Sequence, residues 1–312
     1  MQSHTAEHSR NVLIGSALVL IAAVTVSSKA IMVKLAYAYA VDTESLIALR
    51  MLFAMPFFIA LAVWAQRGGN KTHITLRDGI AIAVFGVIGG YAPMWFDFAG
   101  LEYVSAGLER IILFLYPTMV VLISAVLFGR RIGRREVFAL LVSYVGVGLA
   151  VGHDLTTLKS GAAETLLGAG LVTISALTYA AYLVFSGRVI PRVGTANFTA
   201  YTMLMAGIAS GMHFAVTPHT VPITQLPLPV YRIALLMAVV ATVLPAIMLN
   251  AGIRRLGSSQ ASLISSVGPV STILLAYIFL GEQITAMQLV GTGLVVIGVL
   301  VITLKTRAEA VR

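Results

Sequence analysis

The stretch Pro93-Met-Trp-Phe-Asp-Phe-Ala-Gly100 returns as Pro245-Ala-Ile-Met-Leu-Asn-Ala-Gly252, 152 residues further along the chain. The same offset aligns Leu76–Ala150 with Leu228–Ile302 without a gap. It also places further helix breakers on one another, namely Pro117 on Pro269, Gly129 on Gly281 and Gly146 on Gly298. An offset of 153 extends the match to Gly15, Leu18 and Ile21, which meet Gly168, Leu171 and Ile174. Self-similarity on this scale predicts a chain built from two structural repeats.

The composition places both repeats in a lipid bilayer. Hydrophobic residues make up 59% of the 312 residues and charged residues only 11%, and the mean hydropathy is +0.95. A soluble domain of this length needs far more surface charge. Each apolar run is roughly the 20 residues that a helix needs to cross the hydrocarbon core. The net charge of +9 comes from basic residues in short loops between these runs, so we interpret it as a topology signal and predict no nucleic-acid partner.

The predicted fold is an all-α membrane protein of ten transmembrane helices, arranged as two inverted repeats of five helices each. Turn residues between the apolar runs, such as Arg67-Gly-Gly-Asn70, mark the breaks. The predicted spans are Asn11–Tyr39, Glu44–Gln66, Leu76–Gly100, Val104–Phe128, Arg134–Gly152, Glu164–Ile190, Thr195–Thr217, Pro229–Arg254, Ser258–Leu280 and Thr285–Leu304.

The loop charges predict the orientation. Lys and Arg gather after the second, fourth, sixth, eighth and tenth spans, whereas the alternate loops are poor in them. Basic loops stay in the cytoplasm, so both termini are predicted to be cytoplasmic. Since five spans per repeat is an odd number, the second repeat enters from the opposite face. The predicted division is a tail over residues 1–10, repeats over 11–152 and 160–305, and a second tail over 306–312.

Several segments resemble the EamA domain of the drug/metabolite transporter superfamily. In the second half these are Gly252–Ile302 with Pro269 in mid-helix and Leu280-Gly281-Glu282 at the turn. In the first half, Ala106–Thr118 and Leu49–Phe53 look like variants of the same family. The resemblance covers nearly the whole chain in two copies, although Arg130-Arg131 replaces the Gly-Glu typical of the first-half turn. It implies a transporter of small metabolites, often amino acids, in a bacterial inner membrane.

Helical spacing supplies candidate site residues on the inward faces. Ser262 and Ser265 belong to a stripe of small polar residues in the ninth span, which can line a watery path or allow close helix packing. Tyr179 and Tyr182 share a stripe in the sixth span, and a tyrosine at that depth needs a hydroxyl partner. The repeat relates Tyr182 to Lys29 and Ser262 to Arg110. If the second-half stripes face a central cavity, Lys29 and Arg110 face it as well.

Acidic residues of the first repeat can neutralise these cations. Asp97 and Glu109, with Arg110, Lys34 and Arg50, form a predicted ionic layer in the outer half of the first repeat. A charge near the bilayer centre costs about 2.5 to 3.5 kcal/mol even on the lenient insertion scale, so it must be paired or hydrated. Two interpretations stay open here. The layer is either a structural network of salt bridges, or a site where Lys29 or Arg110 holds a substrate carboxylate and Asp97 or Glu109 takes an amine or a proton.

Four prolines are predicted hinges, because each removes a backbone hydrogen bond within a span. They are Pro93, Pro117, Pro245 and Pro269.

The predicted function is a secondary transporter that exports small metabolites such as amino acids by alternating access. An exchanger of organic anions or phosphates, an uncoupled facilitator and a membrane scaffold remain alternatives, and proton coupling and oligomeric state are not readable. The chain has no cysteine, no His-Glu-x-x-His motif and no Gly-x-Ser-x-Gly elbow, so no enzyme activity, metal site or cofactor is predicted.

Overall fold

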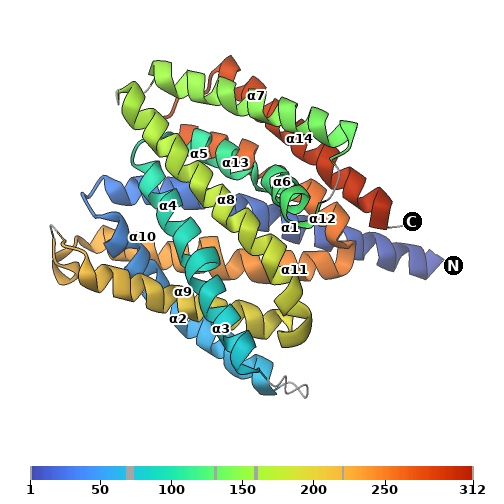
Figure 1. Ribbon diagram of the computed structural model, residues 1–312, viewed down its shortest axis with the longest axis horizontal. Coiled ribbons are helices and arrows are strands. Elements are labelled where there is room, and N and C mark those ends of the chain that lie inside the picture. Colours follow the sequence, from blue (N-terminus) through green and yellow to red (C-terminus); the bar gives the residue numbers. More distant parts are fainter. Residues whose placement is uncertain (1, 68–73, 130–131, 158–160, 220, 311–312) are drawn as a thin grey trace.

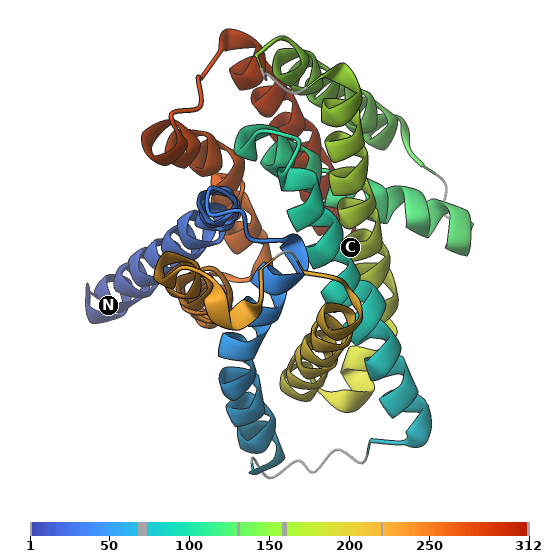
Figure 2. The same cartoon turned by 90° about the vertical axis from the view of Figure 1, so that its left-hand side faces the viewer.

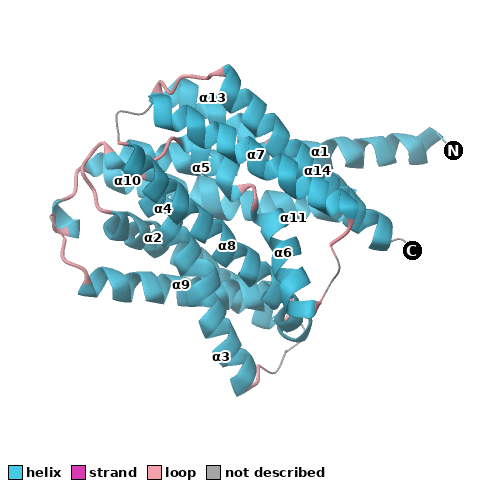
Figure 3. Ribbon diagram, turned by 45° about the horizontal axis from the view of Figure 1, so that its top comes forward, coloured by secondary structure: helices cyan, strands magenta, loops and turns pink. Residues whose placement is uncertain are grey.

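The computed structural model describes residues 2–67, 74–129, 132–157, 161–219 and 221–310, and within these it leaves out the side chains of 2–10, 156–157, 258–259, 262 and 305–310. The replaced turn Arg130-Arg131 and the side chain of Ser262 therefore lie outside the described parts. In those parts every regular element is a helix, and no strand is drawn (Figure 3). The all-helical fold predicted from hydropathy is confirmed.

The first repeat begins with α1 (Gln2–Tyr37) and α2 (Thr43–Arg67). Its third span is divided into α3 (Leu76–Phe85), the π-helical segment η1 (Gly86–Tyr91) and α4 (Ala92–Leu101). Its fourth span is divided into α5 (Ala106–Leu113) and α6 (Tyr116–Phe128), and α7 (Arg134–Thr157) completes it.

The second repeat follows the same order. It comprises α8 (Ala162–Val193), α9 (Thr195–Val216), a short 3-10 turn η2 (Ile223–Gln225), α10 (Leu228–Ala238), π-helical η3 (Val239–Val243), α11 (Leu244–Leu256), α12 (Ser258–Ser265), α13 (Gly268–Leu280) and α14 (Ala286–Ala310). Both end helices extend into the predicted tails, over residues 2–10 and 306–310, since neither range contains a Gly or Pro that would stop a helix.

Within the described residues, nine helical segments are long and apolar enough to cross a membrane. The remaining predicted span, Thr195–Thr217, is α9, a 22-residue helix whose length of about 33 Å suffices for a crossing. Threonine, asparagine, serine and histidine residues lower its hydropathy. It packs along α2, and its residues Asn197, Thr202 and Ser210 are buried, so these polar residues need not face lipid.

The contacts between helices follow the inverted repeat. Helix α1 packs on α11 as α8 packs on α4, and α1 packs on α13 as α8 packs on α6. The pairs α2·α9 and α7·α14 are each formed by two equivalent helices. Figure 1 shows α7 and α14 side by side along one edge and α2 and α9 along the opposite edge, with both chain ends at the same end of the bundle. Figure 2 looks onto the other end, which carries the segments 38–42, 217–219 and 221–227.

Glycine contacts show the same symmetry at atomic detail. A Cβ on Gly100 would lie 2.6 Å from Val172 Cγ2 and 3.0 Å from the carbonyl oxygen of Gly168. A Cβ on Gly252 would lie 2.4 Å from Val19 Cγ2 and 3.1 Å from the carbonyl oxygen of Gly15. The two distances to the valine methyl groups are shorter than a real Cβ tolerates. The glycines that align in the sequence thus allow equivalent helix crossings in the two halves.

The breaks inside the spans are also repeated. The π-helical segments η1 and η3 occupy equivalent positions, and each immediately precedes a helix with a proline in its first turn, Pro93 and Pro245. The fourth span breaks at 114–115 and the ninth at 266–267, just before Pro117 and Pro269. A proline has no N–H to donate, so it is tolerated where a helix restarts.

Candidate functional site

Three helices of the first repeat bring their charged residues together inside the bundle. The Lys29 ammonium on α1 pairs with Asp97 Oδ2 on α4 and lies 3.0 Å from Glu109 Oε1 on α5. The side chains of Lys29, Asp97 and Glu109 are 15%, 4% and 0% exposed. Removing such charges from water costs several kcal/mol each, so they are stable only when each faces an opposite charge. We call these three residues the central triad.

The position of Glu109 follows from the local structure of α5. Ser105 caps this helix, its hydroxyl accepting a hydrogen bond of 3.0 Å from Leu108 N. Glu109 lies in the first turn, where a carboxylate is favoured by the helix dipole. Helix α5 ends at Leu113 and packs against α1, so Glu109 lies beside the helix that carries Lys29.

Arg110 lies beside the central triad and reaches the second repeat. A Cβ on Gly268 of α13 would lie 2.8 Å from Arg110 Nη2, so the guanidinium occupies the space that this glycine leaves open. Among the described residues, no group accepts a hydrogen bond from Arg110 Nε, although this atom is buried. An unpaired guanidinium N–H in such a place can bind a carboxylate or another anion.

Aromatic rings line the neighbouring helices. Tyr179 of α8 meets Tyr116 of α6 edge to face at 5.3 Å between ring centroids and stacks on Tyr182 at 6.0 Å. Tyr182 in turn stacks on Phe198 of α9 at 6.0 Å. Helix α8, which carries Tyr179 and Tyr182, packs against α5, the helix of Arg110. The two predicted tyrosines therefore belong to one aromatic ladder beside that helix.

Two members of the predicted ionic layer lie apart from the triad. Lys34 is five residues beyond Lys29, about 7.5 Å further along α1, and it forms no ion pair with Asp97 or Glu109. Arg50 on α2 donates to Thr242 Oγ1 from Nη2 at 2.9 Å and from Nε at 3.3 Å. Its guanidinium also lies 5.4 Å from the centre of the Phe98 ring. Neither side chain forms an ion pair with a carboxylate of the triad, and the wider ionic layer stays a prediction.

Of the two serines predicted in the ninth span, the structure describes the side chain of Ser265 only. Ser265, the last residue of α12, is half-buried, and no described hydrogen bond joins its side chain to the triad or to Arg110. Two other serines bond between the repeats: Ser27 of α1 donates to the Gly268 carbonyl at 2.9 Å, and Ser175 of α8 donates to the Pro93 carbonyl at 2.7 Å. Ser27 carried no distinguishing signal in the sequence, since its role depends on the crossing of α1 with α13.

The four predicted hinge prolines all occupy the first turn of a helical segment, in α4, α6, α11 and α13. In the second repeat, Thr242 of η3 donates to the Met237 carbonyl at 3.0 Å and accepts from Arg50. Arg50 therefore ties a helix of the first repeat to the π-helical turn of the second. Sequence reasoning missed Thr242, because a π-helical turn has no local sequence signature strong enough to assign it.

A second polar cluster joins the repeats at the end of the bundle that faces the viewer in Figure 2. Glu282, in the turn between α13 and α14, accepts a hydrogen bond of 3.0 Å from Ala106 N at the start of α5. Asp154 of α7 accepts from Ser105 N and from Ser105 Oγ, both at 2.8 Å. Burial raises the pKa of Glu282, against the hydrogen bond from Ala106 and the charge of Lys34. These carboxylates fix the amino-terminal end of α5, the helix that carries Glu109 and Arg110.

Comparisons with known proteins agree with this architecture. The family model described as the EamA-like transporter family matches residues 13–152 and 166–304. The chain is 31% identical over 301 residues to the uncharacterized transporter YcbK of Bacillus subtilis, with 94% of each chain covered. It is 26% identical to the uncharacterized inner membrane transporter YicL of Salmonella typhimurium, with 86% and 88% covered. A solved crystal structure shares the fold with a TM-score of 0.62 at 21% identity, covering 96% of this chain and 99% of the other. With the family model matched twice across an inverted pair of five-helix repeats, the chain belongs to the EamA-like transporter family.

Proposed function

We propose that this membrane transporter exports small zwitterionic metabolites, amino acids or related compounds, by alternating access between its two repeats. The carrying observation is the central triad next to Arg110, which places two cations and two carboxylates where α1 and α5 pack against α13. In this proposal Arg110 binds the substrate carboxylate, and Asp97 or Glu109 binds its ammonium in exchange for Lys29. The aromatic ladder borders the site, and the proline breaks let the halves move.

The balance of charge favours a zwitterion over a simple anion. Lys29 and Arg110 carry two positive charges, and Asp97 and Glu109 carry two negative ones. An organic anion would add an uncompensated charge to this buried place, whereas a zwitterion adds none. A carboxylate released from Lys29 can also take a proton, so the proposal includes coupling to a proton gradient. It further places the protein in a bacterial inner membrane with both termini in the cytoplasm.

The test is transport by purified full-length protein in liposomes. We expect uptake or counterflow of radiolabelled amino acids, which grows when a pH gradient is imposed. Arg110→Ala and Asp97→Asn should each reduce the rate by about tenfold or more, the loss expected when a charge-assisted hydrogen bond disappears. Glu164→Gln, at an exposed position in the first turn of α8, is the control and should keep the wild-type rate.

Three outcomes would contradict the proposal. Preferential movement of phosphate esters or dicarboxylates would identify an anion exchanger. Transport rates that do not change with the pH gradient would contradict the proposed proton coupling. Full transport by both Arg110→Ala and Asp97→Asn would leave the triad as a structural network.

A further inference from the structure

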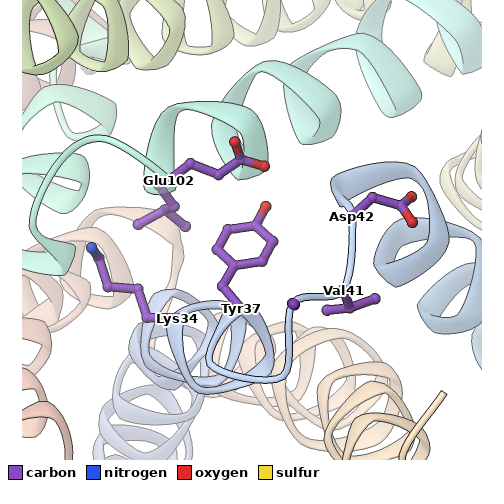
Figure 4. Close-up of a pocket in the computed structure, with 7 residues that line it drawn as sticks. Lys34, Tyr37, Val41, Asp42 and Glu102 are labelled. Carbon is purple, nitrogen blue, oxygen red and sulfur yellow. The ribbon is translucent and has the colours of Figure 1, made fainter. Parts of the chain in front are cut away.

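A polar cavity lies at the end of the bundle opposite the chain termini. Its volume is about 410 Å³, which is within the range of small-molecule sites. It opens where α1 and α4 end, and Figure 4 shows its side chains. The lining residues are Lys34, Tyr37, Ala40, Val41, Asp42, Leu101 and Glu102.

Two opposite charges in this cavity are available to a ligand. The Lys34 ammonium makes no described hydrogen bond or ion pair, although Glu282 and Asp154 act on it electrostatically. Glu102 Oε1 accepts a hydrogen bond of 2.8 Å from Thr43 Oγ1, and no described donor contacts its Oε2. Figure 4 shows the ammonium of Lys34 to the left of the Tyr37 ring and the carboxylate of Glu102 above it, near the Tyr37 hydroxyl.

Asp42, the third charged residue that lines the cavity, already has hydrogen-bond partners within the protein. Its carboxylate accepts from Ser45 N and from Ser45 Oγ, both at 2.8 Å, and lies 3.2 Å from His219 Nδ1. The Tyr37 hydroxyl donates to the Phe98 carbonyl at 2.8 Å. The polar groups left to bind a ligand are therefore one ammonium and one carboxylate.

Lys34 and Glu102 are placed on α1 and at the end of α4 much as Lys29 and Asp97 are, but they do not contact each other. Lys29 and Asp97 contact each other between α1 and α4. Lys34 and Glu102 each lie five residues further along the same two segments, yet no ion pair joins them, and the cavity lies between them. A molecule that carries both a carboxylate and an ammonium could pair with Lys34 and with Glu102 at the same time.

We propose that this cavity is a second binding site for a zwitterion with a small aliphatic side chain. Lys34 binds the carboxylate, Glu102 binds the ammonium, and Ala40 and Val41 receive the side chain. This site deepens the proposed function and rests on it, since it would hold the substrate at the outer face before release. Simple anions are disfavoured, because the wall carries two carboxylates against one ammonium.

The absence of natural cysteines allows a local test. Ala40→Cys places a thiol on the exposed wall of the cavity, and its labelling by a membrane-impermeant maleimide is timed with the full-length protein in liposomes. L-valine should slow the labelling. Isobutylamine, which lacks the carboxylate, and isovalerate, which lacks the ammonium, should not do so at the same concentration. Ala163→Cys, exposed at the start of α8 on the same face, is the control and should stay unprotected.

Charge-neutral variants then assign the protection to this cavity. Added to Ala40→Cys, Lys34→Met or Glu102→Gln should raise the half-protecting valine concentration by roughly tenfold, which corresponds to about 1.4 kcal/mol. Glu44→Gln keeps an acceptor for Trp95 Nε1 and should leave this concentration unchanged. No protection by valine, equal protection by isovalerate, or protection that survives both variants would overturn the site. Transport that persists in these cases would leave the proposed function standing, and protection without any transport would overturn that function instead.

Discussion

Lys29 Nζ and Glu109 Oε1 lie 3.0 Å apart, although 80 residues separate them in the sequence. The same ammonium pairs with Asp97, so one cation from α1 holds two carboxylates from α4 and α5. A contact of this kind fixes how three helices of one repeat meet. Both buried carboxylates therefore depend on the Lys29 ammonium for their counter-charge.

Removal of that side chain should destabilise the fold. Lys29→Met leaves Asp97 and Glu109 facing each other in a dry place, and loss of one partner of a buried ion pair costs about 3 to 5 kcal/mol. We expect a lower melting temperature in detergent and a smaller monodisperse fraction. The triple variant Lys29→Met, Asp97→Asn, Glu109→Gln should recover most of this loss, because neither carboxylate of the triad is then left without its cation. A single variant that melts like wild type would show that the pairing carries little stability.

The symmetric glycine crossings should respond alike to substitution. Gly100→Ala and Gly252→Ala each drive a methyl group to within 2.6 Å or less of a valine methyl, and strain of this kind typically costs about 1 to 3 kcal/mol. Both melting temperatures should fall by similar amounts. Gly170→Ala is the matched control in α8, since a Cβ there meets no atom within 4 Å, and it should be neutral or stabilising. A large difference between the first two variants would argue against equivalent crossings.

The anchor between Arg50 and η3 predicts a specific loss. Thr242→Val removes the oxygen that accepts two hydrogen bonds from Arg50, which leaves a buried guanidinium short of partners. The expected cost is about 1 to 3 kcal/mol, visible in the melting temperature. Thr178→Val is the control, because its exposed hydroxyl bonds only to carbonyls of its own helix, at Ile174 and Ser175. If both variants melt at the same temperature, Arg50 does not depend on Thr242.

The Glu282 carboxyl predicts a pH dependence. Burial raises its pKa above the ordinary value of 4.5, so the folded chain holds this proton to a higher pH than the unfolded chain does. Its contribution to stability is therefore present at low pH and falls as pH rises above 4.5 through the raised pKa. Glu282→Gln still offers an oxygen to Ala106 N and cannot titrate. The melting temperature of this variant should decline less between pH 4.5 and neutrality, and an unchanged decline would contradict the assignment.

Part of the candidate site was predictable because a charged residue inside an apolar segment is easy to recognise in the sequence. Lys29, Asp97, Glu109 and Arg110 stand out in this way, and the repeat placed Lys29 and Arg110 on inward faces. Their pairing was not predictable, since a helix of 3.6 residues per turn defines a face but not the distance to a neighbouring helix. For the same reason the sequence groups Lys34 and Arg50 with the other charges in one layer, whereas in the structure only Lys29 forms ion pairs with Asp97 and Glu109.

The sequence by itself determined the class of fold, because hydropathy, loop charges and the offset of 152 depend on local composition and on order along the chain. Tertiary structure alone decided which carboxylate meets which cation, where η1 and η3 interrupt their spans, and that a cavity lies between Lys34 and Glu102. These features arise from helix crossings between residues far apart in the chain. Their energies depend on distances that only the packed bundle sets.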